Sequence, residues 1–190
     1  MKLMLASGNL HKLRELSLLV IPHELELMPV DVTLPPETGS TFAENAIVKA
    51  RVVAEHTGRL TIADDSGIEA AALGGAPGVM SARYAGPDAT DEDNLEHLLA
   101  EVSDGSAVRY VCAIAVVDPE HGEEHIFHGY CTGTLTPEPR GSGGFGYDPA
   151  FVPDDEHSDR TMAELAPAEK DAISHRGRAA RELLAWLAQR

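Results

Sequence analysis

The sequence is poor in positive charge. It holds 15 lysines and arginines against 31 aspartates and glutamates, and its formal net charge at pH 7 is -16. An acidic surface repels the phosphates of a duplex, so the composition argues against a nucleic-acid partner. An anionic small molecule can still bind if a few cations and a metal ion gather at one place. Most of the acidity is expected to solubilise the surface.

Lysine, cysteine and long apolar runs are scarce as well. The only lysines are Lys2, Lys12, Lys49 and Lys170, so the position of each one is informative. The two cysteines, Cys112 and Cys131, have no partners at metal-ligand spacing and are expected to be buried, reduced thiols. Because the sequence lacks a membrane-spanning run and a signal peptide, it predicts a soluble, cytoplasmic protein with no membrane partner.

The hydrophobic pattern predicts one α/β domain over residues 1–190. A hydrophobic content of 43% is enough for a core. Strands are expected at residues 3–7, 23–28, 60–63, 68–73, 108–118 and 125–136. Helices are expected at residues 10–20, 41–56, 91–102 and 175–188, and loops at 29–39, 74–86 and 141–153. The last two strands are expected to form an antiparallel pair, which favours a mixed sheet flanked by helices.

The stretch SGNLHK, residues 7–12, has the features of an anion site. A turn of small residues between a strand and a helix exposes backbone N–H groups, and the helix dipole adds positive potential. Lys12, one turn into the helix, could reach the same anion. The stretch lacks the glycines of a Walker loop or a dinucleotide fingerprint. An ordinary turn with a surface lysine is therefore the alternative.

The stretch TFAENAIVKAR, residues 41–51, gives one carboxylate two interpretations. Thr41 and Glu44 match the capping box, in which the glutamate bonds back to the cap residue. The functional alternative is that Glu44, near a helix N-terminus, ligates a divalent cation. Lys49 and Arg51 are expected to be solvated cations on the helix face.

Two adjacent aspartates in ADDSG, residues 63–67, stand where an inner strand is expected to end. Ligands collect at such strand ends in α/β folds, and Mg²⁺ takes one or two carboxylates with waters and substrate phosphates. Neighbouring side chains on a strand point to opposite faces, which gives Asp64 and Asp65 different roles. Asp64 is expected to orient the turn or a water, although a bend at Gly67 could bring it to the metal too.

Two later stretches could contact a nucleotide. GSGGFGYDP, residues 141–149, places Phe145 and Tyr147 in a glycine-rich loop, where exposed rings could stack on a nucleobase or simply pack the loop. EKDAISHRGR, residues 169–178, gathers cations at the start of the last helix. The helix dipole disfavours them there, so an anion or a carbonyl-bearing ligand is expected to compensate. The cations are Lys170, His175, Arg176 and Arg178.

Five stretches together resemble the inosine triphosphate pyrophosphatase family, also described as non-canonical purine NTP or dITP/XTP pyrophosphatases. They are SGNLHK, TFAENAIVKAR, ADDSGIEAAALGGAPGVMSARYAG, GGFGYDPAF and EKDAISHRGRA. The match spans residues 7–178 in the family's order. The resemblance implies a homodimeric α/β protein with a long twisted mixed sheet and two lobes around a central nucleotide cleft. It also implies Mg²⁺-dependent hydrolysis of ITP, dITP and XTP to the monophosphate and pyrophosphate, which cleans the nucleotide pool.

The resemblance assigns roles to individual residues. Asp65 would be the catalytic base and, with Glu44, a metal ligand. The triphosphate would be bound by Ser7, Gly8, Asn9, Leu10, His11 and Lys12, and Ser66 would contact the substrate. The base would be held by Phe145, Gly146, Tyr147 and Asp148, with Phe145 stacking on it. Lys170 would complete the binding set, and His175 and Arg176 would read the 6-oxo group of the purine. Ala150 and Ala166 depart from the family's usual leucine and serine, and neither change removes a reactive group.

Two base-facing residues would set the specificity. As donors, His175 and Arg176 would pair with a 6-oxo group and oppose the amino group of adenine, at a cost of roughly 1 to 3 kcal/mol for each mismatch. The same two residues argue against one alternative, a house-cleaning pyrophosphatase for other modified nucleotides. Glu44 with Asp65 argues against the other, a nucleotide-sensing binding protein.

Overall fold

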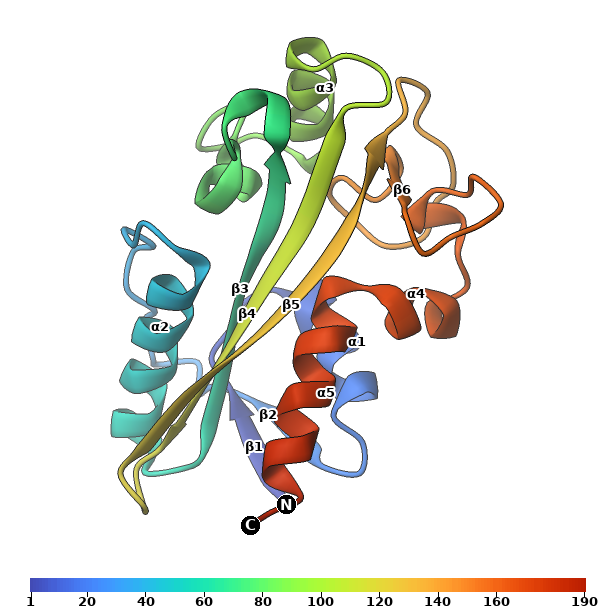
Figure 1. Ribbon diagram of the computed structural model, residues 1–190. Helices are drawn as coiled ribbons and strands as arrows, with labels where there is room; N and C mark the ends of the chain where they lie inside the picture. The colour runs from blue at the N-terminus through green and yellow to red at the C-terminus, as the bar shows by residue number, and fades with distance from the viewer. The chain divides into compact units, whose positions relative to one another are not determined.

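The computed structural model describes all residues from Met1 to Arg190 (Figure 1). The strands are β1 (Lys2–Leu5), β2 (Glu24–Leu27), β3 (Thr61–Ala70), β4 (Ala107–Asp118), β5 (Glu123–Leu135) and β6 (Phe151–Pro153). The α-helices are α1 (Leu10–Leu19), α2 (Phe42–Thr57), α3 (Asp91–Glu101), α4 (Pro167–Ile173) and α5 (His175–Leu187). Short 3₁₀ helices are η1 (Ala71–Leu73), η2 (Gly78–Arg83) and η3 (Met162–Glu164).

The strands form one mixed sheet in the order β2-β1-β3-β4-β5-β6. Strand β1 is parallel to both β2 and β3, whereas β5 and β6 are antiparallel. Strands β4 and β5 are neighbours joined only by residues 119–122. This connection is too short for the crossover that a parallel pair requires, so β4 and β5 are antiparallel as predicted. The expected mixed sheet flanked by helices is confirmed.

Local sequence signals place the helix ends. The Thr41 side chain accepts from the Glu44 amide, which completes the capping box of α2. Helix α2 ends at Gly58, whose φ of 64° lies in the left-handed region that glycine tolerates. Thr90 caps α3 in the same way as Thr41 caps α2. The four predicted helices are therefore confirmed to within one or two residues.

Strand β3 differs from its prediction. The sequence suggested two strands separated by a turn at ADDSG, but one strand runs through Asp64, Asp65 and Gly67 to Ala70. Gly67 makes close packing possible instead of a turn, because a Cβ there would lie 2.4 Å from the Ser81 hydroxyl oxygen. That hydroxyl accepts a hydrogen bond from the Ile68 amide at 2.9 Å. The expectation that the aspartates stand at a strand end is wrong.

Besides the three 3₁₀ helices, one strand and one α-helix were missing from the prediction. Strand β6 has only three residues, and it lies in the expected loop at 141–153. Helix α4 has seven residues and begins with a proline at its first turn, a position where proline is favoured. Both are too short to show a hydrophobic period in the sequence.

The chain divides into two compact units. Unit 1 contains residues 1–65, 112–129 and 176–190, and unit 2 contains residues 66–111 and 130–175. The long strands β3, β4 and β5 each contribute residues to both units. The assignment of residues 1–190 to a single domain stays a prediction.

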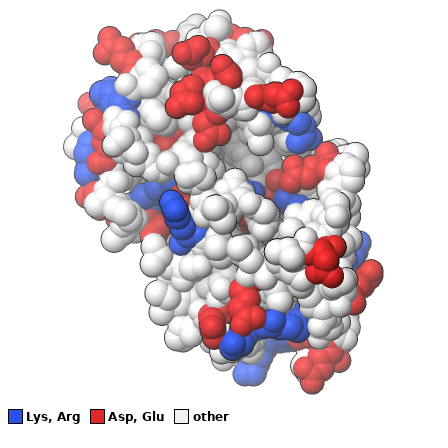
Figure 2. Space-filling model, turned by 180° about the vertical axis from the view of Figure 1, so that it is seen from behind, with Lys and Arg blue, Asp and Glu red and all other residues white.

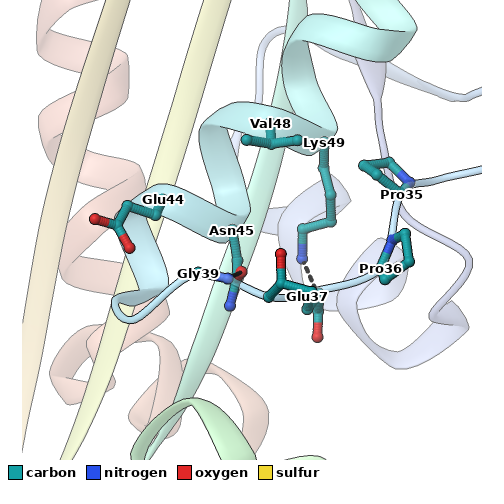
Figure 3. A pocket seen from close by; sticks show the side chains of 9 residues that line it. Pro35, Pro36, Glu37, Gly39, Glu44, Asn45, Val48 and Lys49 are labelled. Atoms are coloured by element: carbon teal, nitrogen blue, oxygen red, sulfur yellow. Dashed lines mark hydrogen bonds and ion pairs between the residues drawn. The ribbon is translucent and has the colours of Figure 1, made fainter.

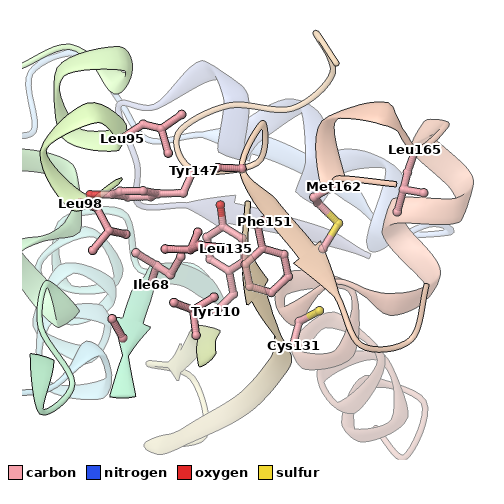
Figure 4. Packing of buried hydrophobic residues seen from close by; sticks show 13 residues of the cluster. Ile68, Leu95, Leu98, Tyr110, Cys131, Leu135, Tyr147, Phe151, Met162 and Leu165 are labelled. Carbon is pink, nitrogen blue, oxygen red and sulfur yellow. The ribbon is translucent and has the colours of Figure 1, made fainter. Parts of the chain in front are cut away.

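Each unit has its own core. In unit 1 the strands pack against α1 and α5 through one apolar cluster and against α2 through another, so helices cover both faces of these strands (Figure 1). In unit 2 residues from the strands pack with Leu95 and Leu98 of α3 and with the segment around Tyr147 (Figure 4). The thiols of Cys112 and Cys131 are buried and form no disulfide, as predicted, and burial raises the pKa of Cys112 to about 12.

Surface charge is dispersed. Acidic side chains are scattered over the face shown in Figure 2, and basic side chains lie beside them. Lys2 and Arg59, for example, both pair with Glu26, at 2.8 and 2.7 Å. None of the helices has the length and apolar character needed to cross a membrane.

Two leucines of α1 provide a test of this packing. Leu16 is fully buried, whereas Leu18 on the same helix is 58% exposed. Leu16→Ala is expected to lower the free energy of unfolding by about 2 to 5 kcal/mol, because it leaves a cavity in the core. Leu18→Ala should change it by less than about 0.5 kcal/mol. Urea unfolding of both variants measures the two changes. Equal losses of unfolding free energy would contradict the assignment of which face of α1 packs against the core.

Candidate functional site

Asp64 is the centre of charge in unit 1. Its carboxylate is 1% exposed and lies 3.1 Å from the Lys12 ammonium and 3.2 Å from the Arg176 guanidinium. Burial alone would raise the pKa of Asp64, but Lys12, Arg176 and Lys49 together hold it well below its usual range. Asp64 is therefore an ionised structural carboxylate that joins α1 and α5 to β3. It orients no turn, since the strand continues past it.

Arg176 is enclosed at the start of α5. Its side chain is 2% exposed, and its guanidinium contacts the carboxylate of Glu15 as well as that of Asp64. The compensating anions expected for this helix start are thus provided by the protein itself. The role of Arg176 toward a purine stays a prediction.

Asp65 has different surroundings from Asp64. Its Oδ2 accepts from the Asn45 amide at 3.0 Å, and its Oδ1 lies 3.6 Å from the Lys49 ammonium. Burial raises the pKa of Asp65, and the opposing effect of Lys49 does not overcome it. The two adjacent aspartates thus contact different sets of partners, as the alternation of a strand predicts. One stays ionised, and the other has an increased affinity for a proton.

Lys49 is buried, so its prediction as a solvated cation is wrong. Its ammonium donates to Glu37 Oε1 at 2.6 Å and to the Asp64 carbonyl oxygen at 2.9 Å. Lys49 follows Phe42 by seven residues and Ala46 by three, which places it in the buried stripe of α2. That spacing was the sequence signal for its burial. Arg51, in contrast, is exposed and pairs with Glu124, as expected of a surface cation.

Glu44 serves the cap of α2. Its Oε2 accepts from the Ser40 amide at 2.7 Å, the Ser40 hydroxyl at 2.8 Å and the Thr41 amide at 3.2 Å. These hydrogen bonds, led by that of the Ser40 hydroxyl, lower the pKa of Glu44. The structural interpretation of Glu44 is confirmed. Any metal coordination would therefore fall to its other oxygen.

A pocket of about 210 Å³ adjoins these groups. It lies between the start of α2 and the preceding loop and is lined by Pro35, Pro36, Glu37, Thr38, Gly39, Glu44, Asn45, Val48 and Lys49 (Figure 3). In this view the Glu44 carboxylate points away from the ion pair of Glu37 and Lys49. Asn45 links the pocket to Asp65 through its side-chain amide.

The donor set suits Mg²⁺ only in part. Nowhere do three or more histidine, cysteine, aspartate or glutamate side chains form a cluster able to hold a metal. Glu44 and Asp65 can offer two carboxylates, which is the usual protein contribution to Mg²⁺ when waters and substrate phosphates complete the shell. The roles of these two residues as metal ligands stay predictions.

The turn at residues 7–12 is less open than predicted. Asn9 caps α1 by accepting from the amides of His11 at 2.8 Å and Lys12 at 3.3 Å. The Asn9 amide itself donates to the Ser7 hydroxyl oxygen at 3.1 Å. The expectation of exposed amides is therefore wrong for Asn9, His11 and Lys12. The phosphate-binding roles of residues 7–12 stay predictions.

The remaining residues that the resemblance assigns to the substrate, Phe145–Asp148, Lys170, His175 and Ser66, belong to unit 2. Tyr147 is 4% exposed, and its hydroxyl donates to the Ser81 carbonyl oxygen at 2.8 Å. Of the two interpretations of Tyr147, packing of the loop is confirmed, because its ring belongs to the core. Phe145 is only half-buried, and the Lys170 ammonium lies 5.5 Å from its ring centroid.

Asp148 is buried among donors. Its Oδ2 accepts from the Lys170 ammonium at 2.7 Å and from the Phe145 amide at 3.0 Å, and its Oδ1 accepts from the Tyr110 hydroxyl at 3.0 Å. The Tyr110 ring in turn stacks on His175. No motif in the sequence singled out Tyr110, because it stands in an ordinary apolar strand.

Comparison with known proteins identifies the family. The model of the Ham1 family matches residues 3–186. A Corynebacterium efficiens protein named dITP/XTP pyrophosphatase is 46% identical, with 100% of this chain and 98% of that protein covered. One of the same name from Mycolicibacterium paratuberculosis is 47% identical, with 96% and 93% covered.

A solved structure agrees with these sequence matches. The HAM1 protein of Coxiella burnetii has a TM-score of 0.87 and 44% identity, and the alignment covers 100% of both chains. The resemblance noted in the five sequence stretches is thereby confirmed. With the family model and relatives covered nearly end to end, the chain belongs to the Ham1 family.

Proposed function

We propose that this chain hydrolyses non-canonical purine nucleoside triphosphates, ITP, dITP and XTP, to the monophosphate and pyrophosphate. The observation that carries the proposal is Asp65, a buried carboxylate with a raised pKa between Asn45 and Lys49. The relatives named dITP/XTP pyrophosphatase supply the substrate class. Their name denotes hydrolases of phosphoanhydride bonds, and this chain is an enzyme of that class.

Asp65 acts as the general base. A carboxylate with a raised pKa takes a proton from water more readily than an ordinary one does. The hydrogen bond from Asn45 fixes the orientation of Oδ2. The activated water attacks the α-phosphorus, and pyrophosphate leaves from the opposite side. No covalent intermediate with the protein forms.

The cations around Asp64 and Asp65 balance the charge of the triphosphate. Lys12 and Lys49 are two of only four lysines, and both ammonium groups lie beside these aspartates. We assign triphosphate binding to residues 7–12, with a further substrate contact from Ser66. Glu44 and Asp65 would hold Mg²⁺, which would offset charge on the phosphates.

We assign recognition of the base to Phe145, His175 and Arg176. Phe145 offers a partly exposed ring for stacking, and His175 and Arg176 donate to the 6-oxo group. Adenine presents an amino donor at that position and leaves these donors unpaired. The homodimer, the nucleotide cleft and the cytoplasmic location implied by the resemblance belong to this proposal as predictions.

A substrate panel tests the function. Pyrophosphate release is measured from ITP, XTP, GTP, ATP and dUTP, each with Mg²⁺ and with a chelator. We expect release from ITP and XTP with Mg²⁺ and little from ATP, because of the 6-oxo group. Preferred release from dUTP would indicate a pyrophosphatase for other nucleotides. ITP that binds but stays intact would indicate a sensor.

Asp65→Asn separates catalysis from folding. Loss of the base is expected to lower kcat by roughly 100-fold or more. Burial raises the pKa of Asp65, so its charged form is less favourable in the folded protein than in the unfolded chain. Asp65 therefore lowers the stability of the wild type once the pH exceeds the pKa of unfolded aspartate, about 3.9. In metal-free buffer the variant should therefore be more stable than the wild type at pH 7, and this gain should vanish as the pH falls below about 4. Urea unfolding and pyrophosphate release measure the two effects, and full activity would remove Asp65 as the base.

Asp64→Asn should have the opposite effect on stability. The pKa of Asp64 is lowered, so its charge stabilises the fold above about pH 4, and this stability is lost as the pH falls toward the lower folded pKa. At pH 7 the variant is expected to lose about 3 to 5 kcal/mol, because two buried cations lose their partner. Urea unfolding at pH 7 and pH 3 measures the difference. A variant as stable as the wild type would show that Lys12 and Arg176 do not need Asp64.

A further inference from the structure

Tyr110 of β4 connects two residues that the proposed function assigns to the base. Its ring is parallel to the His175 imidazole, with centroids 4.5 Å apart and an interplanar angle of 8°. Phe151 packs against the same tyrosine at 4.6 Å with a tilt of 43°. The tyrosine is thus fixed by the core on one side and sets the plane of the imidazole on the other. The direction of a histidine N–H follows from that plane.

The Tyr110 hydroxyl leads to the loop that carries Phe145. It donates to Asp148 Oδ1, while Asp148 Oδ2 accepts from the Lys170 ammonium and from the Phe145 amide. Both oxygens of Asp148 are therefore engaged within the protein, and the residue is 3% exposed. A carboxylate held in this way is poorly placed to accept a hydrogen bond from a ligand.

The loop backbone rests directly on this ion pair. At Gly144, where φ is 72°, a Cβ would lie 1.9 Å from Asp148 Oδ2 and 2.9 Å from the Lys170 ammonium. Any other residue would displace the pair or the loop. The position of Phe145, the next residue, consequently depends on the geometry of Asp148 and Lys170.

We propose that Tyr110, Asp148 and Lys170 form a buried support that positions Phe145 and His175 for recognition of a 6-oxopurine. In this arrangement Tyr110 is a positioning residue that determines specificity. Asp148 and Lys170 act through the loop and through Tyr110. The inference rests on the proposed function and names the residues that give the same site its selectivity.

The test uses the full chain with two variants of Tyr110. Tyr110→Phe keeps the stacked ring and removes the hydroxyl, and Tyr110→Leu removes both. Tyr130→Leu is the matched control, because Tyr130 is an exposed tyrosine on the neighbouring strand β5. KM and kcat are measured for ITP and ATP, thermal melting follows the fold, and NMR records the His175 ring-proton resonance.

Loss of the support should appear in KM and in selectivity. We expect Tyr110→Leu to raise KM for ITP about tenfold and to lower the preference for ITP over ATP, with kcat changed less than about threefold. Tyr110→Phe should raise KM about threefold, since one neutral hydrogen bond is lost. The His175 resonance, shifted by the stacked ring in the wild type and in Tyr130→Leu, should move in Tyr110→Leu.

Two results would overturn the proposal. One is a folded Tyr110→Leu with unchanged KM and unchanged preference for ITP, whether or not kcat falls. If Tyr110→Leu does not fold, the second result is an unchanged KM for ITP in both Tyr110→Phe and Asp148→Asn. If the wild type releases no pyrophosphate from ITP, the proposed function fails by itself. The support is then judged by the His175 resonance alone. It is overturned if the wild type, Tyr110→Phe and Tyr110→Leu all show the same His175 resonance.

Discussion

Burial of the Asp64 carboxylate is the constraint on which the arrangement of unit 1 depends. An ionised group out of contact with water must be compensated from within the protein, and this chain has few cations to use. Lys12 arrives from α1 and Arg176 from α5, so both helices are bound to β3 through one carboxylate. Lys49 of α2 adds a hydrogen bond to the Asp64 carbonyl oxygen. Three helices are thereby tied to a single residue of the central strand.

The same cations explain why the next residue behaves differently. Asp65 points to the other face of β3, where its carboxylate lies 3.6 Å from the Lys49 ammonium and accepts from one neutral amide. Burial therefore raises its pKa, whereas strong pairing lowers that of Asp64. A strand that alternates between faces can in this way hold an anchoring anion next to a proton acceptor. Neither property would survive if the strand bent and brought both side chains to one site.

Local signals in the sequence were sufficient for much of the fold. Capping residues such as Thr41 and Thr90 act within one helical turn, so their effect can be recognised from a few neighbouring residues of the sequence.

The turn predicted at ADDSG is absent because the aspartates are paired with partners distant in the chain. A buried ion pair removes the reason for a turn. Arg176 is 112 residues from Asp64, and no spacing rule connects them. The role of Asp65 as a base came from the family resemblance, and that of Glu44 as a metal ligand was first suggested by its place near a helix N-terminus. The surroundings of both residues required the structure.

Lysine scarcity turned out to be the most informative feature of composition. Lys12, Lys49 and Lys170 each contact a buried aspartate, and only Lys2 lies in an exposed ion pair. The two units use these lysines differently. In unit 1 Lys49 is shared among Glu37, the Asp64 carbonyl oxygen and Asp65, so Asp65 keeps its raised pKa. In unit 2 the Asp148 carboxylate accepts from a lysine, a tyrosine hydroxyl and a backbone amide, which fixes its geometry. Three direct donors make this carboxylate part of the framework, whereas Asp65 keeps an increased affinity for a proton. The proton acceptor that we propose therefore belongs to unit 1, and the proposed support for base recognition belongs to unit 2.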